Sequence, residues 1–224
     1  MMNISDDIKY VGCDDSTLDL FEGQYKLNYG VTYNSYVILD EKIAIMDTVD
    51  KRTTDEWISN LENVLGDKIP DYLVVQHLEP DHSGSMQVLA QKYPGMDIVC
   101  SERAAAMVPQ FVNMDLSKRI ISVKEGDTLT LGNHTLTFIM APMVHWPEVM
   151  MTYDAVSKTL FSADGFGTFG DSRNRISWIV EARRYDFNII GKYGTSVQNV
   201  LKKAENLDIK NIAPLHGPVL GKDV

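Results

Sequence analysis

Cysteine is scarce in this sequence, and that scarcity excludes two classes of protein. Only Cys13 and Cys100 occur in 224 residues, which is too few for a disulfide framework or for a zinc site built from thiolates. We expect both to be free or buried thiols, as is typical of a reducing compartment. The sequence also lacks an apolar run of membrane-spanning length, and its start, MMNISDDIKY, has neither the basic flank nor the apolar core of a signal peptide. We therefore expect a cytoplasmic protein.

Basic residues are also fewer than acidic residues in this sequence. Lysine and arginine together number 21 against 31 acidic residues, which gives a formal net charge of −10. Such a chain is repelled by the phosphates of nucleic acids and by anionic membranes, so neither is expected as a partner. The hydrophobic share of 44% and the charged share of 23% are ordinary for a folded protein. Because no internal repeat, low-complexity segment or linker interrupts the chain, we expect a single domain over residues 1–224.

The first half of the chain is rich in predicted strands. Residues 33–47 carry β-branched runs on either side of Asp40-Glu41, which predicts a hairpin. Residues 53–66 combine a threonine cap, acidic residues in the first turn and apolar residues at helical spacing, which predicts a helix. The elements expected next are strand 71–76, helix 84–93, strand 97–101 and helix 102–112.

The second half does not alternate regularly between strand and helix. A Gly-Asn turn between two period-two runs predicts a hairpin over 126–142, and a similar pattern predicts another over 148–164. Helices are expected at about 175–190 and 195–206, before a last strand within 209–218. Strand meanders mixed with helices favour an α+β fold in which two sheets pack together and helices lie outside.

Imidazole and carboxylate side chains gather where the predicted strands end. The motif QHLEPDHSGS, residues 76–85, follows strand 71–76 and is the densest of these places. The candidate metal ligands are His77, Glu79, Asp81, His82, His145, Asp164 and His216. Loops at strand ends are where a rigid scaffold presents functional groups, so these loops would converge on one edge if the strands are aligned.

A turn or cap is the ordinary role of any one histidine or aspartate at a strand end. The joint pattern favours metal binding, because a turn has little need of four potential ligands within six residues. His134 lies beside a hairpin turn and is assigned a structural role. Asp47 is expected to hydrogen-bond near the site without binding metal, and Trp146 to pack over it and limit solvent access.

The candidate ligand set is hard and mixed, with four imidazoles, three carboxylates and no thiolate. Imidazole with carboxylate suits iron, manganese or zinc in an open site, whereas structural zinc usually takes cysteines. Seven ligands exceed what one ion requires, so two ions that share a bridging carboxylate fit better. Such a pair can clamp a small ligand between the ions. Composition alone leaves iron and zinc both open.

Seven segments of the chain resemble the metallo-β-lactamase-like domain of the flavodiiron proteins. They occur in the expected order as DLFEGQY, YNSYVI, HLEPDHSGS, HWPEVMMTY, LFSADGFGTFG, ARRYDFNIIGKYG and LDIKNIAPLHGPV. Zinc hydrolases of this superfamily carry H-x-H-x-D-H, and the flavodiiron branch replaces the middle histidine with glutamate. Glu79 is that glutamate here, and it makes the site more anionic, which favours iron over zinc.

The resemblance implies a fold, a cofactor and a ligand assignment. The fold is a four-layer αβ/βα sandwich, and the cofactor is a diiron centre of two iron ions with a bridging oxygen species. The implied ligands are His77, Glu79 and His145 for one iron, Asp81, His82 and His216 for the other, and Asp164 as the bridge. The position of His82 does not always bind metal within the family. The usual activity is reduction of O2 to water or of NO to N2O.

Two departures from the family pattern bear on function. Family members normally continue into a flavodoxin domain that binds FMN, whereas this sequence stops eight residues after His216. We therefore expect a form that lacks the flavodoxin domain and holds no FMN; an excised piece of a longer protein is the other interpretation. The segment 171–181 is also shorter than the acidic insertion usual there, so the substrate pocket is expected to differ.

Three functional hypotheses follow. The first is a non-haem diiron protein that binds O2 as a sensor or store, a role that flavin-less relatives suggest, with a signalling protein as partner. The second is an O2 or NO reductase that receives electrons from a separate flavoprotein or rubredoxin. The third is a dinuclear zinc hydrolase, which Glu79 disfavours. Family members are often head-to-tail dimers, so a homodimer stays open.

Overall fold

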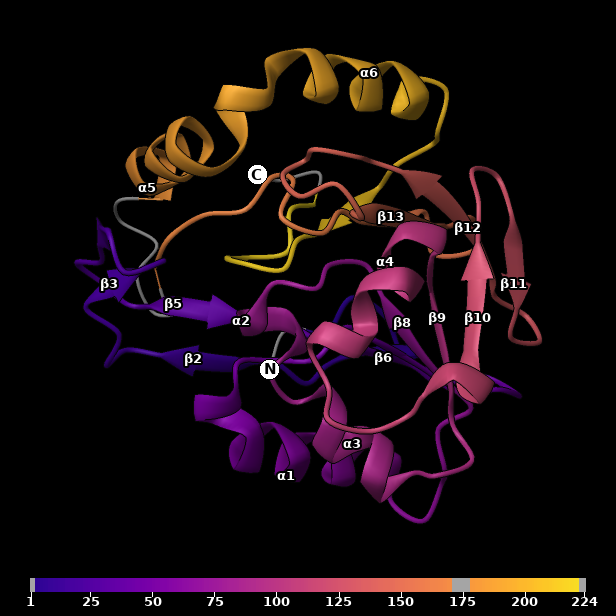
Figure 1. The fold of residues 1–224 in the computed structure, drawn as a ribbon. Helices are drawn as coiled ribbons and strands as arrows, with labels where there is room; N and C mark the ends of the chain where they lie inside the picture. The colour runs from indigo at the N-terminus through magenta and orange to yellow at the C-terminus, as the bar shows by residue number, and fades with distance from the viewer. Residues whose placement is uncertain (1–2, 171–177, 222–224) are drawn as a thin grey trace.

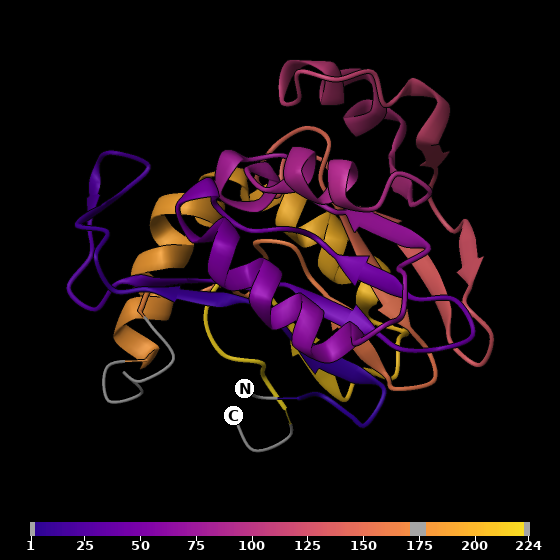
Figure 2. The ribbon, with the colours of Figure 1, turned by 90° about the horizontal axis from the view of Figure 1, so that it is seen from below.

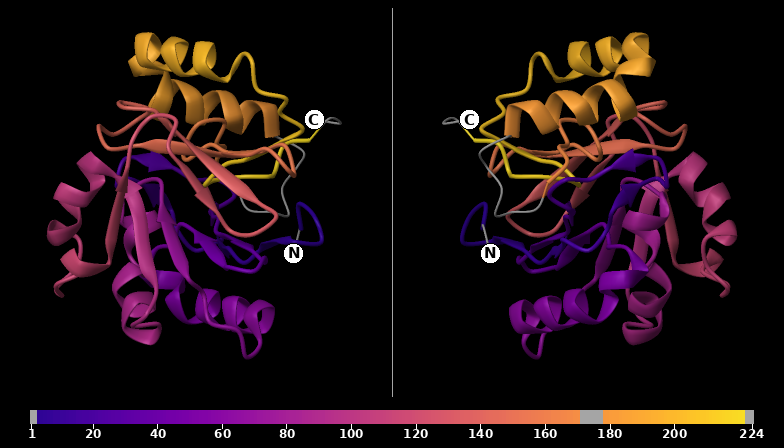
Figure 3. Two further views of the ribbon diagram at one scale, coloured as in Figure 1. Left: turned by 90° about the vertical axis from the view of Figure 1, so that its right-hand side faces the viewer. Right: turned by 90° about the vertical axis from the view of Figure 1, so that its left-hand side faces the viewer.

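Two β-sheets lie against each other, and helices cover their outer faces (Figures 1 and 3). The structure is a computed structural model that describes residues 3–170 and 178–221. The first sheet has six strands in the order β1-β6-β7-β8-β9-β10, and the second has five in the order β11-β12-β13-β14-β15. The α+β class and the sandwich of two sheets between helices are therefore confirmed.

The first sheet changes from antiparallel to parallel pairing as the chain crosses it. β1 and β6 pair antiparallel, as do β6 and β7, whereas β7, β8, β9 and β10 run parallel. The strands are β1 Ile8–Tyr10, β6 Tyr36–Ile38, β7 Ala44–Met46, β8 Tyr72–Val75, β9 Asp97–Ser101 and β10 Ile120–Val123. Because β7 and β8 are parallel, their carboxyl ends lie at the same edge of the sheet.

The second sheet is antiparallel except for its last pair, β14 and β15. Its strands are β11 Thr128–Thr130, β12 Thr135–Met140, β13 Met150–Asp154, β14 Thr159–Phe161 and β15 Asn211–Ala213. Two small antiparallel pairs stand apart from both sheets: β2 Cys13–Asp15 with β5 Val31–Tyr33, and β3 Leu20–Phe21 with β4 Tyr25–Lys26. The β3–β4 hairpin projects from the body of the domain, at the left of Figure 2.

Helices from the two halves of the chain cover opposite outer faces. The helices are α1 Thr54–Leu65, α2 Pro80–Ser83, α3 Met86–Lys92, α4 Glu102–Met107, α5 Trp178–Tyr185 and α6 Gly194–Ala204. Figure 3 shows α1 and α3 on the first sheet and α5 and α6 on the second. A π-helical segment, Asp186–Ile190, follows α5 directly. None of the described helices is long and apolar enough to cross a membrane.

Alternating side chains of β7 and β8 build two separate cores. Ala44 and Met46 join a cluster that includes Phe138 and Phe161 of the second sheet, so this core lies between the sheets. Ile45, between them in sequence, joins the other cluster together with α1 residues. Successive strand residues point to opposite faces, so a strand buried on both sides needs apolar residues at every position. This explains why β6, β7 and β8 are buried throughout.

The predicted elements are present, with shorter bounds. The expected hairpin 33–47 contains β6 and β7, the expected helix 84–93 contains α3, and the expected helix 195–206 overlaps α6, which begins one residue earlier. The start of the helix expected from about 175, and the part of the shortened segment 171–181 up to residue 177, lie outside the described residues. Cys13 and Cys100 are both buried and free, as predicted.

The short N-terminal strands and β10 were not predicted from the sequence. No element was predicted between strand 71–76 and helix 84–93, whereas Pro80–Ser83 form the short helix α2. Proline is favoured in the first turn of a helix because the backbone N–H that it lacks has no helical partner there. The helix is a single turn, too short for a periodic apolar pattern to reveal it.

Gly84, directly after α2, allows this helix to approach the backbone at Asp50 and Lys51, just before α1. A Cβ atom at this position would lie 2.5 Å from the Pro80 carbonyl oxygen and 2.7 Å from the Lys51 nitrogen. Both are backbone atoms, so relief of the clash would displace α2 itself.

We predict that Gly84→Ala lowers the free energy of unfolding by about 2 kcal/mol, because overpacking against backbone strains the fold. Urea unfolding followed by circular dichroism measures the change. Gly95→Ala is the matched control, because a Cβ there would have no atom within 4 Å. Equal stability of the two variants would contradict the predicted constraint on α2.

Candidate metal centre

The seven predicted ligands come from four places where the chain leaves a strand. His77 follows β8, Glu79 caps α2, and Asp81 and His82 lie on that helix. The other three come from the second half of the chain: His145 from the β12–β13 connection, Asp164 after β14 and His216 after β15. The structure brings all seven together in two neighbouring groups whose ligand atoms lie within 4.8 Å of one another.

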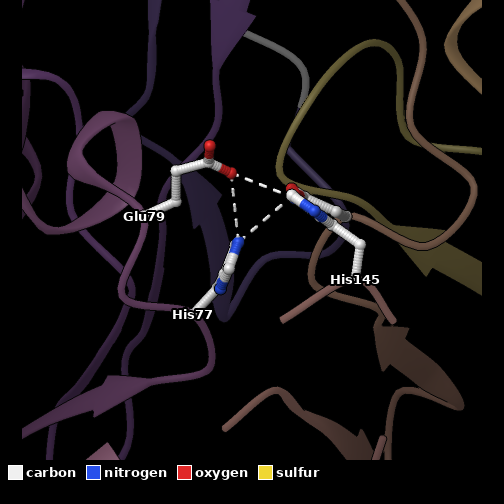
Figure 4. A group of neighbouring side chains, drawn as sticks. His77, Glu79 and His145 are labelled. Atoms are coloured by element: carbon white, nitrogen blue, oxygen red, sulfur yellow. Dashed lines mark hydrogen bonds and ion pairs between the residues drawn. The ribbon is translucent and has the colours of Figure 1, made fainter. Parts of the chain in front are cut away.

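The first group contains His77, Glu79, His145 and Asp164. Glu79 Oε2 lies 3.0 Å from His145 Nε2 and 3.3 Å from His77 Nε2. Figure 4 shows these three side chains pointing toward one another, two from the first half of the chain and one from the second. Imidazole nitrogens and a carboxylate oxygen thus converge on one small volume, as ligands of a single ion do.

The second group contains Asp81, His82 and His216. His216 Nε2 lies 3.1 Å from Asp81 Oδ2, and the rings of His82 and His216 are 4.7 Å apart between centroids. Both imidazoles are buried, and the Asp81 side chain is 12% exposed. Two nitrogens and one carboxylate therefore face a second position beside the first.

Asp164 lies between the two groups and presents one oxygen to each. Its Oδ2 is 2.9 Å from His145 Nε2 and 3.5 Å from His77 Nε2. Its Oδ1 is 3.2 Å from His82 Nε2 and 3.8 Å from His216 Nε2. A buried carboxylate that faces an imidazole pair on either side is placed where it could bridge two ions, which is the role that the family resemblance implies for Asp164.

Hydrogen bonds join Glu79 to His77 and His145, but they do not account for the other close contacts in the two groups. Within the described residues, both carboxylate oxygens of Asp81 and Asp164, both ring nitrogens of His82 and Nε2 of His216 are buried with no hydrogen-bond partner. Buried polar atoms without partners are costly, and buried charges normally pair with other charges or coordinate metals. The donor set of nitrogen and oxygen atoms fits two hard or borderline divalent ions.

Protons balance part of the carboxylate charge when no metal is bound. Burial opposes a charge on His145, but the nearby carboxylates of Asp164 at 2.9 Å and Glu79 at 3.0 Å outweigh it and raise the pKa of His145 to about 9. Burial likewise opposes the charge on Glu79, yet His145 and His77 lower the pKa of Glu79 to about 2. Metal binding must displace the His145 proton, so affinity for metal rises with pH until His145 is neutral.

Hydrogen bonds on the far side of two imidazoles orient them toward the centre. His77 Nδ1 lies 2.8 Å from Glu148 Oε1, and His216 Nδ1 lies 2.6 Å from the carbonyl oxygen of Thr32. If each Nδ1 carries the proton that these acceptors require, each Nε2 is left as a lone pair facing the candidate centre.

The contacts of Thr32 and Glu148 with candidate ligands were not predicted from the sequence. Glu148 stands within the motif HWPEVMMTY, but its partner His77 is 71 positions away. The partner of Thr32, His216, is 184 positions away. The only available signal was for Glu148, an acidic residue three positions after a candidate ligand.

Asp47 and Trp146 lie near the candidate centre, as expected, whereas His134 lies apart from it, as its assigned structural role implies. Asp47 binds no candidate ligand atom, and its carboxylate accepts hydrogen bonds from the backbone of Gln76 at 2.7 Å and of His77 at 3.3 Å. The Trp146 ring packs edge-on against His77 at 5.3 Å between centroids. His134 lies elsewhere, with Nδ1 2.9 Å from Asp154 Oδ2.

Comparison with known proteins identifies the family of this chain. The model of the family described as "ODP family beta lactamase" matches residues 31–217, which is most of the chain and includes every candidate ligand. The chain belongs to this family.

Relatives of this ODP domain are flavodiiron proteins and nitric oxide reductases. It is 35% identical to "Nitric oxide reductase" of Moorella thermoacetica over 98% of this chain and 57% of that protein. It is also 35% identical to "Anaerobic nitric oxide reductase flavorubredoxin" of Aliivibrio fischeri over 97% of this chain and 46% of that protein. The ODP chain thus spans about half the length of the curated relatives it matches.

Solved structures agree with this assignment. Rubredoxin oxygen:oxidoreductase from Desulfovibrio gigas superposes with a TM-score of 0.92 at 31% identity, covering 99% of this chain and 58% of that one. The flavodiiron protein from Giardia intestinalis superposes with a TM-score of 0.86 at 29% identity, covering 97% and 54%. The resemblance to flavodiiron proteins and the metallo-β-lactamase-like fold of the ODP domain are therefore confirmed. That the seven side chains bind metal stays a prediction.

We predict that Glu148→Gln lowers the affinity of the ODP domain for divalent metal about tenfold, because a neutral amide holds and polarises His77 less well than a carboxylate. Competition with a chromophoric chelator measures the affinity. Glu102→Gln, which changes an exposed glutamate on α4, is the control. If both variants keep the parent affinity, Glu148 does not support the candidate ligand His77.

Proposed function

We propose that this chain holds two iron ions and binds O2 at them, as an oxygen-binding or oxygen-sensing protein. The observation that carries the proposal is the position of Asp164, which offers one oxygen to each of two groups of imidazoles and carboxylates. In this proposal one iron takes the group with Glu79 and the other takes the group with Asp81 and His82. When bound, a ferrous pair supplies two electrons to a diatomic ligand and a place to hold it.

The chain's own residues would orient the ligands and exclude water. Glu148 and the Thr32 carbonyl fix the rings of His77 and His216 from behind. Phe21 packs edge-on against the His216 ring at 5.2 Å between centroids, and Trp146 does the same against His77. Aromatic cover on both groups supports a site that admits a small molecule and little solvent.

Iron is proposed over zinc because of Glu79. This carboxylate stands where a zinc hydrolase of the same superfamily has a histidine. Its Oε2 lies 3.3 Å from His77 Nε2 and 3.0 Å from His145 Nε2. A third carboxylate makes the donor set harder, which suits iron. Flavodiiron proteins among the similar structures support the same choice.

A second function, reduction of NO or O2, is favoured by the names of the relatives. They include a nitric oxide reductase and a rubredoxin oxygen:oxidoreductase. Reduction of O2 to water takes four electrons, and a ferrous pair alone holds two, so turnover would require a separate flavoprotein or rubredoxin as donor. The single domain and the cytoplasmic location stay predictions. A homodimer stays open.

One anaerobic experiment separates the two functions. The protein is loaded with ferrous iron, checked for two irons per chain, and mixed with one equivalent of O2 while the visible spectrum is recorded. An oxygen-binding protein is expected to show a spectral change that lasts for minutes and no rapid O2 consumption with added reductant. Repeated O2 or NO consumption with a flavoprotein or rubredoxin would identify a reductase instead, and absence of bound iron would contradict both.

We further predict that Glu79→His shifts metal selectivity from iron toward zinc, because it replaces a hard oxygen donor with an imidazole. The protein is loaded from equal concentrations of ferrous and zinc ions, and the bound metals are determined by elemental analysis. Asp67→Asn, on the exposed turn after α1, is the control for a lost carboxylate away from the site. An unchanged iron-to-zinc ratio in Glu79→His would remove the main argument for iron.

A further inference from the structure

A cavity of about 240 Å³ opens beside the candidate metal centre. Two candidate ligands, Glu79 and Asp81, form part of its wall, and their side chains are 13% and 12% exposed. The other candidate ligands are 3% exposed or less. A small molecule that enters this cavity therefore meets the two groups of ligands from their most accessible side.

Two further carboxylates, Glu22 and Asp50, line the same cavity. None of the described residues in its wall is a lysine or an arginine, and the remainder is apolar or aromatic, including Leu20 and Tyr33. Two basic residues act on these carboxylates from outside the wall: Arg52, which is paired with Asp15 at 2.9 Å, acts on Asp50, and Lys192 acts on Glu22. The entrance is thus lined by one sign of charge.

The β3–β4 hairpin holds Glu22 at this entrance. Phe21, the residue before it, packs against the ring of His216, which anchors the hairpin over the second group of ligands. On the other side of the turn, the Tyr25 hydroxyl donates to the Asn188 carbonyl oxygen at 3.4 Å. Glu22 has a φ of 50°, an uncommon conformation for a residue other than glycine. Burial and the nearby Glu79 carboxylate raise the pKa of Glu22, which agrees with a position facing the site.

Asp50 is held at the cavity by its position as the N-cap of Lys51–Thr53, a short 3₁₀ helix that precedes α1. Its Oδ1 accepts a hydrogen bond from the Arg52 backbone nitrogen at 2.8 Å, so the side chain has a defined orientation. Burial and the charge of Asp81 raise the pKa of Asp50. Neither Glu22 nor Asp50 belongs to the two groups of candidate ligands.

We propose that Glu22 and Asp50 form a charge filter at the mouth of the metal centre, which admits neutral diatomic molecules and holds back anions. The inference rests on the proposed dinuclear centre. Two divalent ions carry one positive charge more than the ligand carboxylates of Glu79, Asp81 and Asp164, so the side of the centre that faces the cavity would attract anions. The Glu148 carboxylate lies behind the His77 ring, away from the bound ions. The two additional carboxylates reverse that sign at the entrance.

The charge filter would restrict the proposed site to neutral substrates. O2 and NO are neutral and cross such an entrance without electrostatic cost. β-Lactams and phosphodiesters, which dinuclear zinc hydrolases process, carry a carboxylate or a phosphate and are repelled. Two features therefore disfavour hydrolysis of such substrates: the negative charge at the entrance and the carboxylate of Glu79 among the candidate ligands.

The test uses the protein loaded with Co(II), whose visible absorption reports ligand binding without any turnover. Azide is the anionic probe and imidazole, at mildly alkaline pH, the neutral one. Glu22→Gln and Asp50→Asn are each expected to tighten azide binding about threefold and the double variant about tenfold, with imidazole unchanged. The difference should shrink as salt is added, because the effect acts between hydrated charges.

The variants keep the local structure, since glutamine still accepts the hydrogen bond from Gln24 and asparagine still caps the helical turn. Glu41→Gln with Asp67→Asn is the control for loss of two exposed charges elsewhere. If the double variant binds azide as the parent does, or if its affinity for imidazole changes equally, the charge filter is wrong. The proposed dinuclear centre would still stand in that case, provided that the parent binds two Co(II) ions. Failure of the parent to bind two Co(II) ions would overturn the centre and the filter together.

Discussion

The meeting of one buried carboxylate with four imidazoles is the constraint on which the rest of this structure depends. Asp164 is fully buried, and its two oxygens face His145 and His77 on one side and His82 and His216 on the other. Burial of an isolated carboxylate is costly, so the surrounding groups must supply positive charge, from protons or from metal ions. The two sheets have to present these groups from opposite halves of the chain to one point.

The fold meets this requirement by aligning strand ends. In the first sheet, β7 and β8 run parallel, and their ends place Asp47 and His77 next to each other. In the second, the parallel pair β14 and β15 places Asp164 and His216 at the same edge. The strands themselves contribute apolar residues to two cores, so the rigid part of each sheet ends where the polar residues begin. The candidate ligands thus lie in connections whose ends are held in place by the two sheets.

Much of this arrangement could be predicted from the sequence because its signals are local. Apolar runs with turns between them indicate strands, and a histidine or an aspartate directly after such a run marks the edge of a sheet. The single turn α2 and the two-residue strands of the β3–β4 hairpin could not be predicted, because they are too short for periodicity. Glu148, Thr32 and Glu22 were missed for a different reason. Their roles come from partners that only the folded chain brings near.

The contact between Thr32 and His216 has a consequence for how the protein is made. It closes a loop of 184 positions, and Asn34 reinforces it with hydrogen bonds to the carbonyl oxygens of Pro214 and Gly217, both at 2.8 Å. During synthesis, the N-terminal half can form its strands and its part of the ligand set long before His216 leaves the ribosome. The second group of candidate ligands is then complete only once residue 216 has been synthesised. A nascent chain interrupted before that residue carries an incomplete candidate centre, because His216 and its contact with Thr32 are missing.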